Sequence, residues 1–164
     1  KFNFLVMNTL LGGGMSSRLF QNIREKHGLA YSIYSFHDFM YDTGIFGTYI
    51  GTDPERETQA VKLLKEELAR LCDEKVSTAE LERTKNQLKG GLLLGLESSS
   101  SRMNRLANME MYLGRYYSLD EVVEGIEDVT SADMQTLAQD LFEEEQQTLT
   151  VIRPSQEGSE EEEE

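Results

Sequence analysis

Apolar residues near the start of the chain recur at the spacing of a helix, and this pattern stops at three glycines, residues 12–14. The apolar positions of this first helix are Phe2, Leu5, Val6, Thr9 and Leu10. Ser16 or Ser17 can cap a second helix, and Gly28 is a typical C-terminal stop. The buried face of the second helix is predicted to carry Leu19, Phe20 and Ile23.

After Gly28 the apolar period changes from helical spacing to two. The stretches LAYSIYSF and GIFGTYIGT are rich in aromatic and β-branched residues, and residues 41–44 between them carry a turn signal. We therefore expect an antiparallel hairpin. Gly47 and Gly51 would leave one side of its second strand bare, which suggests close approach by a helix or a ligand.

The second half of the chain reads as a series of helices. Thr52, Asp53 and Pro54 open a helix whose apolar face is formed by Val61, Leu64, Leu68 and Leu71. Further helices are predicted over residues 79–97, 101–113, 119–128 and 131–143. Capping boxes are predicted at Ser77 with Glu80, Ser118 with Glu121, and Thr130 with Asp133. A last apolar stretch, residues 148–153, predicts a strand that Pro154 ends.

This order of elements predicts an α+β fold, with a mostly antiparallel sheet and helices packed on one of its faces. Residues 1–153 are expected to form one domain, and residues 154–164 an acidic, disordered tail. Three strands are too few for so many helices, so we expect one or more N-terminal strands to be missing from this sequence.

The charge of the chain narrows the classes of partner. The formal net charge is −14, and the six glutamates at 157 and 160–164 supply −6 of it, which leaves an acidic body. Nucleic acid binding is not expected, because it requires clustered Lys and Arg. The acidic surface favours basic peptides, although solubility alone also explains it. No apolar run is long enough to span a bilayer, and we expect a soluble protein of the bacterial cytoplasm, the periplasm or an organellar matrix.

The sequence does not support a metal site, a nucleophilic cysteine or a phosphate-binding loop in this chain. His27 and His37 fall on different predicted elements, and no pair of histidines with a glutamate has the spacing of a zinc helix. Cys72 is the only cysteine and lies beside an apolar helix face, so we interpret it as a packing residue. The glycines at 12–14 are better explained as a helix stop than as a phosphate loop.

Arg24 and Tyr31 are the candidate site residues. Arg24 is in the last turn of the second predicted helix and Tyr31 begins the first strand, with the reversal at Gly28 between them. A guanidinium fork beside a neutral hydroxyl donor suits peptide carbonyls or an oxyanion. The ordinary alternative is that Arg24 complements the helix dipole and Tyr31 packs on an amphipathic strand.

The sequence also resembles a known family. The segment LLGGGMSSRLFQNIREKHGLAYSIYS, residues 10–35, closely resembles the second, zinc-free domain of the pitrilysin or insulinase-like zinc metallopeptidases, in particular the branch of the mitochondrial processing peptidases. The resemblance continues through TGIFGTYIGT, VSTAELERTKNQLKGGLLLGLESSSSRM and IEDVTSADMQTLAQDLF to LTVIRP, and covers roughly residues 5–153.

The resemblance implies a clamshell of two homologous domains around a peptide chamber. The opposing domain would bind zinc through a His-x-x-Glu-His helix, so this chain is expected to hold no metal and to be inactive alone. Arg24 and Tyr31 match the family's arginine and tyrosine in identity and in their separation of seven residues. By this resemblance Tyr31 would donate to the scissile carbonyl, and Arg24 would hold a neighbouring carbonyl.

Two functions follow from the resemblance. In the first, the chain is the substrate-binding half of a metalloendopeptidase, paired in cis or in trans with a zinc-bearing domain or closed as a homodimer. In the second, it is a non-catalytic scaffold or assembly subunit of the same fold. A scaffold has no need of the pair, so the presence of both Arg24 and Tyr31 favours the peptidase.

Overall fold

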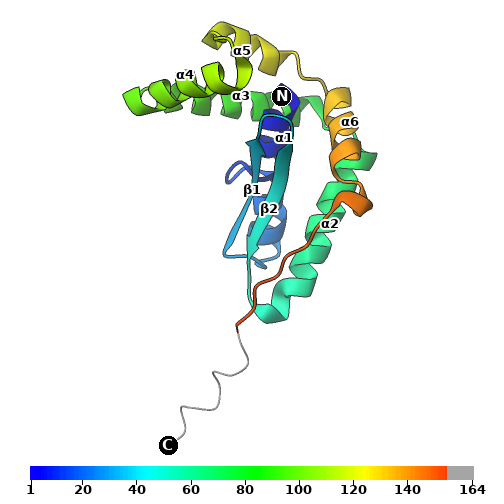
Figure 1. Ribbon diagram of the computed structural model, residues 1–164. Coiled ribbons are helices and arrows are strands. Elements are labelled where there is room, and N and C mark those ends of the chain that lie inside the picture. The colour runs from blue at the N-terminus through cyan, green and yellow to red at the C-terminus, as the bar shows by residue number, and fades with distance from the viewer. Residues whose placement is uncertain (155–164) are drawn as a thin grey trace, which may run out of the picture.

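A computed structural model describes residues 1–154 and shows helices packed with a two-stranded antiparallel sheet (Figure 1). This arrangement confirms the predicted α+β class. Residues 155–164 of the predicted acidic tail, 154–164, lie outside the described residues. The elements are α1 (Phe2–Gly12), η1 (Phe20–Lys26), β1 (Ser32–Phe39), β2 (Gly44–Gly51), η2 (Pro54–Arg56), α2 (Glu57–Asp73), α3 (Thr78–Gly95), α4 (Ser99–Leu113), α5 (Leu119–Glu127), α6 (Ser131–Leu141) and η3 (Glu144–Gln146).

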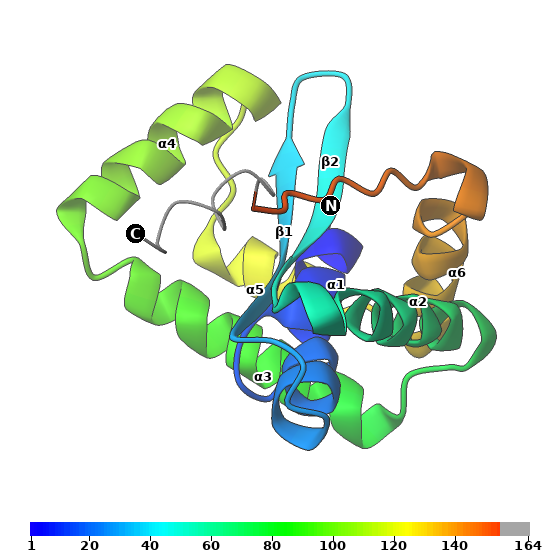
Figure 2. The same cartoon turned by 90° about the horizontal axis from the view of Figure 1, so that it is seen from below.

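Helix α1 is the centre of the core. It contacts β1, α3, α5 and α6, and Figure 2 shows it enclosed between the hairpin and these helices. An apolar helix of this kind is stable only when it is covered on most sides. Its buried side chains include Val6, Met7, Leu10 and Leu11.

The hairpin has one buried and one exposed face. Ile33 pairs with Ile50 and Ser35 with Thr48 on the covered face, where Ser35 Oγ donates to the carbonyl of Asn8 at 2.9 Å. The opposite face carries exposed aromatic rings, those of Tyr34, Phe36 and Tyr49. The helical layer therefore covers one side of the sheet within the described residues.

Two glycines allow neighbouring groups to pack directly on the backbone, one in the core and one on the sheet. A Cβ on Gly12 would lie 2.1 Å from the backbone nitrogen of Ser35, so α1 rests directly on β1. A Cβ on Gly47 would lie 2.4 Å from the ring of Phe36, its partner in the strand register. The Phe36 ring, from the other strand of the hairpin, thus covers Gly47. The sequence had suggested that a helix or a ligand would approach the strand at this position.

The predicted strand over residues 148–153 is wrong. This stretch is irregular, and no backbone hydrogen bond joins it to another part of the described chain. A strand requires a ladder partner, and the only sheet among residues 1–154 consists of β1 and β2. The segment is held instead by Arg153, whose guanidinium pairs with Glu57 of α2 at 2.7 Å.

Helix caps largely follow the prediction. Ser118 with Glu121 and Thr130 with Asp133 form complete capping boxes at α5 and α6. Ser77 accepts from the backbone nitrogen of Glu80 at 3.3 Å, which is one half of a box. The other half is absent, because the carboxylate of Glu80 binds Arg18 instead.

Helix α4 lies at the outside of the molecule. None of its side chains is buried, and Met103, Leu106 and Met111 are more than half exposed. It ends at Gly114 in the left-handed conformation, as the sequence predicts. No helix in the described part of the chain combines the length and apolar character needed to cross a bilayer.

Candidate functional site

Arg24 lies in a helix of unusual geometry. The sequence predicts an α-helix here, whereas residues Phe20–Lys26 form a π-helix, with hydrogen bonds that span five residues. Its guanidinium carbon sits 4.8 Å from the centre of the Phe20 ring, which is a cation–π contact. The arginine head is therefore steadied by its own helix and stays exposed at its end.

Gly28 makes the predicted reversal. Its φ of +62° is a left-handed conformation that glycine adopts without strain. The backbone nitrogens of Gly28 and Leu29 donate to the carbonyls of Arg24 and Ile23, at 3.0 and 2.9 Å. These bonds satisfy the end of η1 and direct the chain into β1.

Tyr31 lies just before β1 and opposite the end of β2. Its backbone nitrogen donates to the carbonyl of Gly51 at 2.8 Å, which continues the ladder by one residue. Its side chain is 61% exposed and its hydroxyl donates to Oδ1 of Asp53. Acceptance of this hydrogen bond by the Asp53 carboxylate raises the pKa of Tyr31 above its ordinary 10.0, because it favours the protonated phenol.

The segment after β2 is tied back to the reversal. Arg56 Nη1 donates to the carbonyl of Gly28 at 2.8 Å, and Thr52 Oγ1 donates to the carbonyl of Leu29. Arg56 Nε also lies 3.7 Å from Oδ2 of Asp53. These contacts hold residues 28–31 against residues 51–56, although none of the three side chains was singled out as a site residue from the sequence.

Arg24 and Tyr31 thus flank the same turn but have different partners. Arg24 contacts Phe20, whereas Tyr31 contacts Asp53. Both side chains are exposed. Arg24 thus presents an always-charged fork donor and Tyr31 a neutral O–H donor beside the same turn, and each type of donor suits a carbonyl oxygen.

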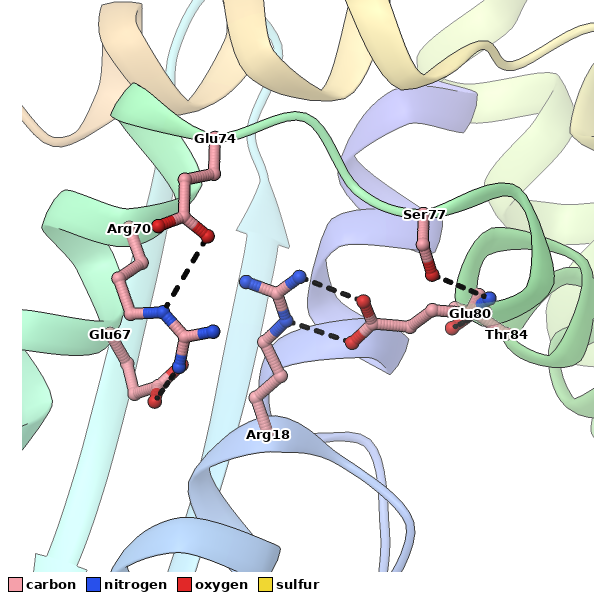
Figure 3. A network of polar contacts seen from close by, with 7 residues as sticks. All are labelled: Arg18, Glu67, Arg70, Glu74, Ser77, Glu80 and Thr84. Atoms are coloured by element: carbon pink, nitrogen blue, oxygen red, sulfur yellow. Dashed lines mark hydrogen bonds and ion pairs between the residues drawn. The ribbon is translucent and has the colours of Figure 1, made fainter.

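The helix that carries Arg24 is anchored by a polar network (Figure 3). Arg18 Nε and Nη2 donate to the two carboxylate oxygens of Glu80, each at 2.8 Å. Asn22 Nδ2 donates to Glu67 Oε1 at 2.8 Å, and Arg70 pairs with the same oxygen at 2.9 Å. η1 is therefore tied to α2 through Glu67 and, by way of Arg18, to α3.

This network places charge in the interior. Glu67 is 3% exposed, and the hydrogen bonds from Arg18 lower the pKa of Glu80. The Arg18 Nη1 and Glu67 Oε2 atoms are buried without a hydrogen-bond partner among the described residues. The sequence did not identify either glutamate as an anchor, because Asn22 lies 45 positions from Glu67 and Arg18 lies 62 positions from Glu80.

The other candidates do not form a site in the described residues. His27 Nδ1 lies 2.7 Å from the carbonyl of Asn22. His37 packs against the ring of Phe39, its Nδ1 is buried without a hydrogen-bond partner among the described residues, and burial lowers its pKa. The Cys72 thiol lies 3.4 Å from the carbonyl of Ala138, and burial raises its pKa. Within residues 1–154, no three His, Cys, Asp or Glu side chains group in a way that fits a metal ion.

Comparisons with known proteins identify a family match and related proteins. Residues 1–88 match the family described as the peptidase M16 inactive domain. The chain is 41% identical over 154 residues to the zinc protease YmxG of Bacillus subtilis, an alignment that covers 94% of this chain and 37% of that protein. The chain spans about a third of the length of the curated relatives it matches.

Solved structures share the fold. A conserved protein of Enterococcus faecalis superposes with a TM-score of 0.72 and 28% identity, over 84% of this chain and 32% of that one. A chain of complex III2 from Candida albicans superposes with a TM-score of 0.74 and 23% identity, over 85% of this chain and 36% of its own. The second likeness, at this low identity, concerns the fold alone.

Proposed function

The chain belongs to the peptidase M16 inactive-domain family, and on that premise we propose that it is the substrate-binding, zinc-free half of a zinc metalloendopeptidase. Its match to this family confirms the resemblance carried by residues 10–35. In the proposal, this domain and a zinc-bearing domain enclose a peptide between them. The domain is then of the processing-peptidase type and contributes donors to the peptide backbone rather than a metal.

The observation that carries the proposal is the placement of Arg24 and Tyr31. Both are exposed polar donors and both flank the turn at Gly28. Their identities and spacing match the pair that the resemblance implies for this family. The exposure of Tyr31 supports this role, because a phenol that served only to pack the sheet would be buried. A role in which Arg24 only complements the helix dipole would not require a tyrosine beside it. The cation–π contact of Arg24 with Phe20 limits the rotamer entropy that this side chain loses when a peptide binds.

The two donors have distinct roles in the proposal. Tyr31 has a neutral O–H that can donate to the scissile carbonyl and more strongly to the oxyanion that forms from it. Arg24 has a permanently charged fork that can hold a neighbouring carbonyl and so fix the register of the peptide. The first role affects the transition state, whereas the second affects binding in the ground state as well.

Zinc belongs to the other domain in this proposal. The residues described in this chain do not fit a metal ion, so no chemical step is assigned to a metal here. Bound zinc would polarise the carbonyl and activate water. We propose that the zinc-bearing domain lies in the same polypeptide or in a partner subunit, and that a homodimer is the further way to close the chamber.

The acidic character of the chain bears on the substrate. With a net charge of −14, the protein attracts cationic ligands over distances set by the ionic strength. Basic peptides are therefore the proposed substrates. The alternative function, a non-catalytic scaffold or assembly subunit, would place no demand on Arg24 and Tyr31.

Substitution of Arg24 tests the proposal in the protein assembled with its zinc-bearing domain, whether that domain lies in the same polypeptide or in a partner subunit. With Arg24→Met we expect KM for an unstructured basic peptide to rise about tenfold or more, because a charged hydrogen bond to the substrate is lost. Lys26→Met is the matched control, since Lys26 is an exposed cation in the same turn. Equal effects of the two variants would attribute the change to net charge and contradict the assigned role.

A further inference from the structure

Asp53 accepts the only hydrogen that the Tyr31 side chain can donate. A phenol has one O–H, and an ionised carboxylate is an acceptor only. The hydroxyl of Tyr31 donates to Asp53 Oδ1, and Arg56 Nε lies 3.7 Å from the other carboxylate oxygen. While this bond is made, the hydroxyl has no hydrogen left for a peptide carbonyl.

We propose that Asp53 is the resting acceptor for Tyr31 and competes with the substrate carbonyl for its hydroxyl hydrogen. The inference rests on the proposed function, because it assigns Tyr31 to the substrate. On binding, the O–H···O bond to Asp53 breaks and an O–H···O bond to the carbonyl oxygen forms, with the proton remaining on the phenol. Asp53 does not touch the substrate in this proposal and acts on it only through Tyr31.

The surroundings of Asp53 allow this exchange. The side chains of Asp53 and Arg56 are 43% and 52% exposed, so water can solvate the carboxylate once the phenol leaves. Arg56 stays beside Asp53 because its Nη1 is separately held by the carbonyl of Gly28 at 2.8 Å. Asp53 precedes η2 without capping it through its side chain, so the exchange breaks no helix-capping hydrogen bond.

The charged groups that act on Tyr31 are Asp53 and Arg56, and they act in opposite directions. The hydrogen bond to Asp53, together with its negative charge, raises the pKa of Tyr31, whereas the charge of Arg56 lowers it. Loss of the carboxylate should therefore lower the pKa of Tyr31. This change is measurable whether or not the protein acts on peptides.

The first arm of the test is a titration of the full-length protein. A single 3-fluorotyrosine at position 31 is followed by ¹⁹F NMR against pH, with and without Asp53→Asn. We expect a lower pKa and a shifted resonance in Asp53→Asn, and no change in the control Glu55→Gln, an exposed carboxylate two positions away. An unchanged titration in Asp53→Asn means that Asp53 does not hold the hydroxyl, and it overturns the proposal.

The second arm is kinetic. With Asp53→Ala we expect kcat/KM for a basic peptide to rise about two- to fivefold, the range for loss of an exposed polar contact. In the Tyr31→Phe background the same change should have no effect. A fall in kcat/KM would show that Asp53 orients Tyr31 for the reaction, and an unchanged value would show no competition; either overturns the proposal.

The two arms separate this inference from the proposed function. If Tyr31→Phe itself retains the kcat/KM of the wild type, the proposed role of Tyr31 fails, and the competition fails with it. The titration of position 31 then still reports whether Asp53 binds the hydroxyl. If Tyr31→Phe is impaired and the titration is unchanged by Asp53→Asn, only the inference about Asp53 fails.

Discussion

Arg18 and Glu80 form a two-point ion pair, with both N–H···O distances at 2.8 Å, that ties the helix carrying Arg24 to α3. The side chains are only 15% and 26% exposed. A fork-to-fork geometry of this kind fixes orientation as well as distance. The position of the candidate site therefore depends on a contact between residues 62 positions apart.

Breaking this pair should destabilise the protein. With Glu80→Gln we expect a loss of about 2 kcal/mol in the free energy of unfolding, because the Arg18 charge is left partly buried without its partner. Urea denaturation measures the change. Glu66→Gln is the control, since its pair with Lys62 is exposed and long at 3.8 Å and should contribute less than about 0.5 kcal/mol. Equal losses in both variants would contradict the account.

The ion pair between Arg18 and Glu80 should also make the stability of the protein depend on pH in the acidic range. The hydrogen bonds from Arg18 lower the pKa of Glu80 below its ordinary 4.5 in the folded protein. The unfolded protein therefore binds more protons in this range, and the contribution of Glu80 is lost as pH falls below 4.5. We expect the urea midpoint to fall less between pH 7 and about pH 3.5 in Glu80→Gln than in the wild type. An identical fall in both proteins would show that Glu80 is not linked to acid unfolding.

Two glycines should respond in opposite directions to alanine. Gly12→Ala places a Cβ 2.1 Å from the backbone of Ser35, so we expect a loss of about 3 kcal/mol or more. Gly91 lies inside α3 with open space around its Cβ position, so Gly91→Ala should stabilise the protein by about 0.5–1 kcal/mol. Thermal and urea unfolding measure both. A tolerated Gly12→Ala would contradict the close packing of α1 on β1.

Local patterns were sufficient to predict most of the elements. The apolar run that ends at Gly12, the turn between β1 and β2, and the boxes at Ser118 and Thr130 depend on neighbours within a few positions, and each is present. The reversal at Gly28 was likewise predicted, because a left-handed glycine has few alternatives at a helix end.

Long-range partners account for what the sequence did not reveal. Residues 148–153 have the composition of a strand, but a strand also needs an edge to pair with. Glu80 has the position of a capping-box acid, yet Arg18 competes for its carboxylate. The contact between Tyr31 and Asp53 was hidden for the same reason, since the hairpin register brings them together across 22 positions.

The most direct test of the central claim is the effect of Tyr31→Phe on peptide hydrolysis by the full-length protein at fixed zinc occupancy. If Tyr31 donates to the transition state, kcat/KM for an unstructured basic peptide should fall about 10²-fold or more, mainly through kcat. Tyr41→Phe is the control, because Tyr41 is 87% exposed in the hairpin turn, and it should keep the rate of the wild type. An unchanged rate in Tyr31→Phe would contradict the claim and would mean that this domain encloses the peptide without contributing to catalysis. A wild-type protein without peptidase activity would favour the scaffold function.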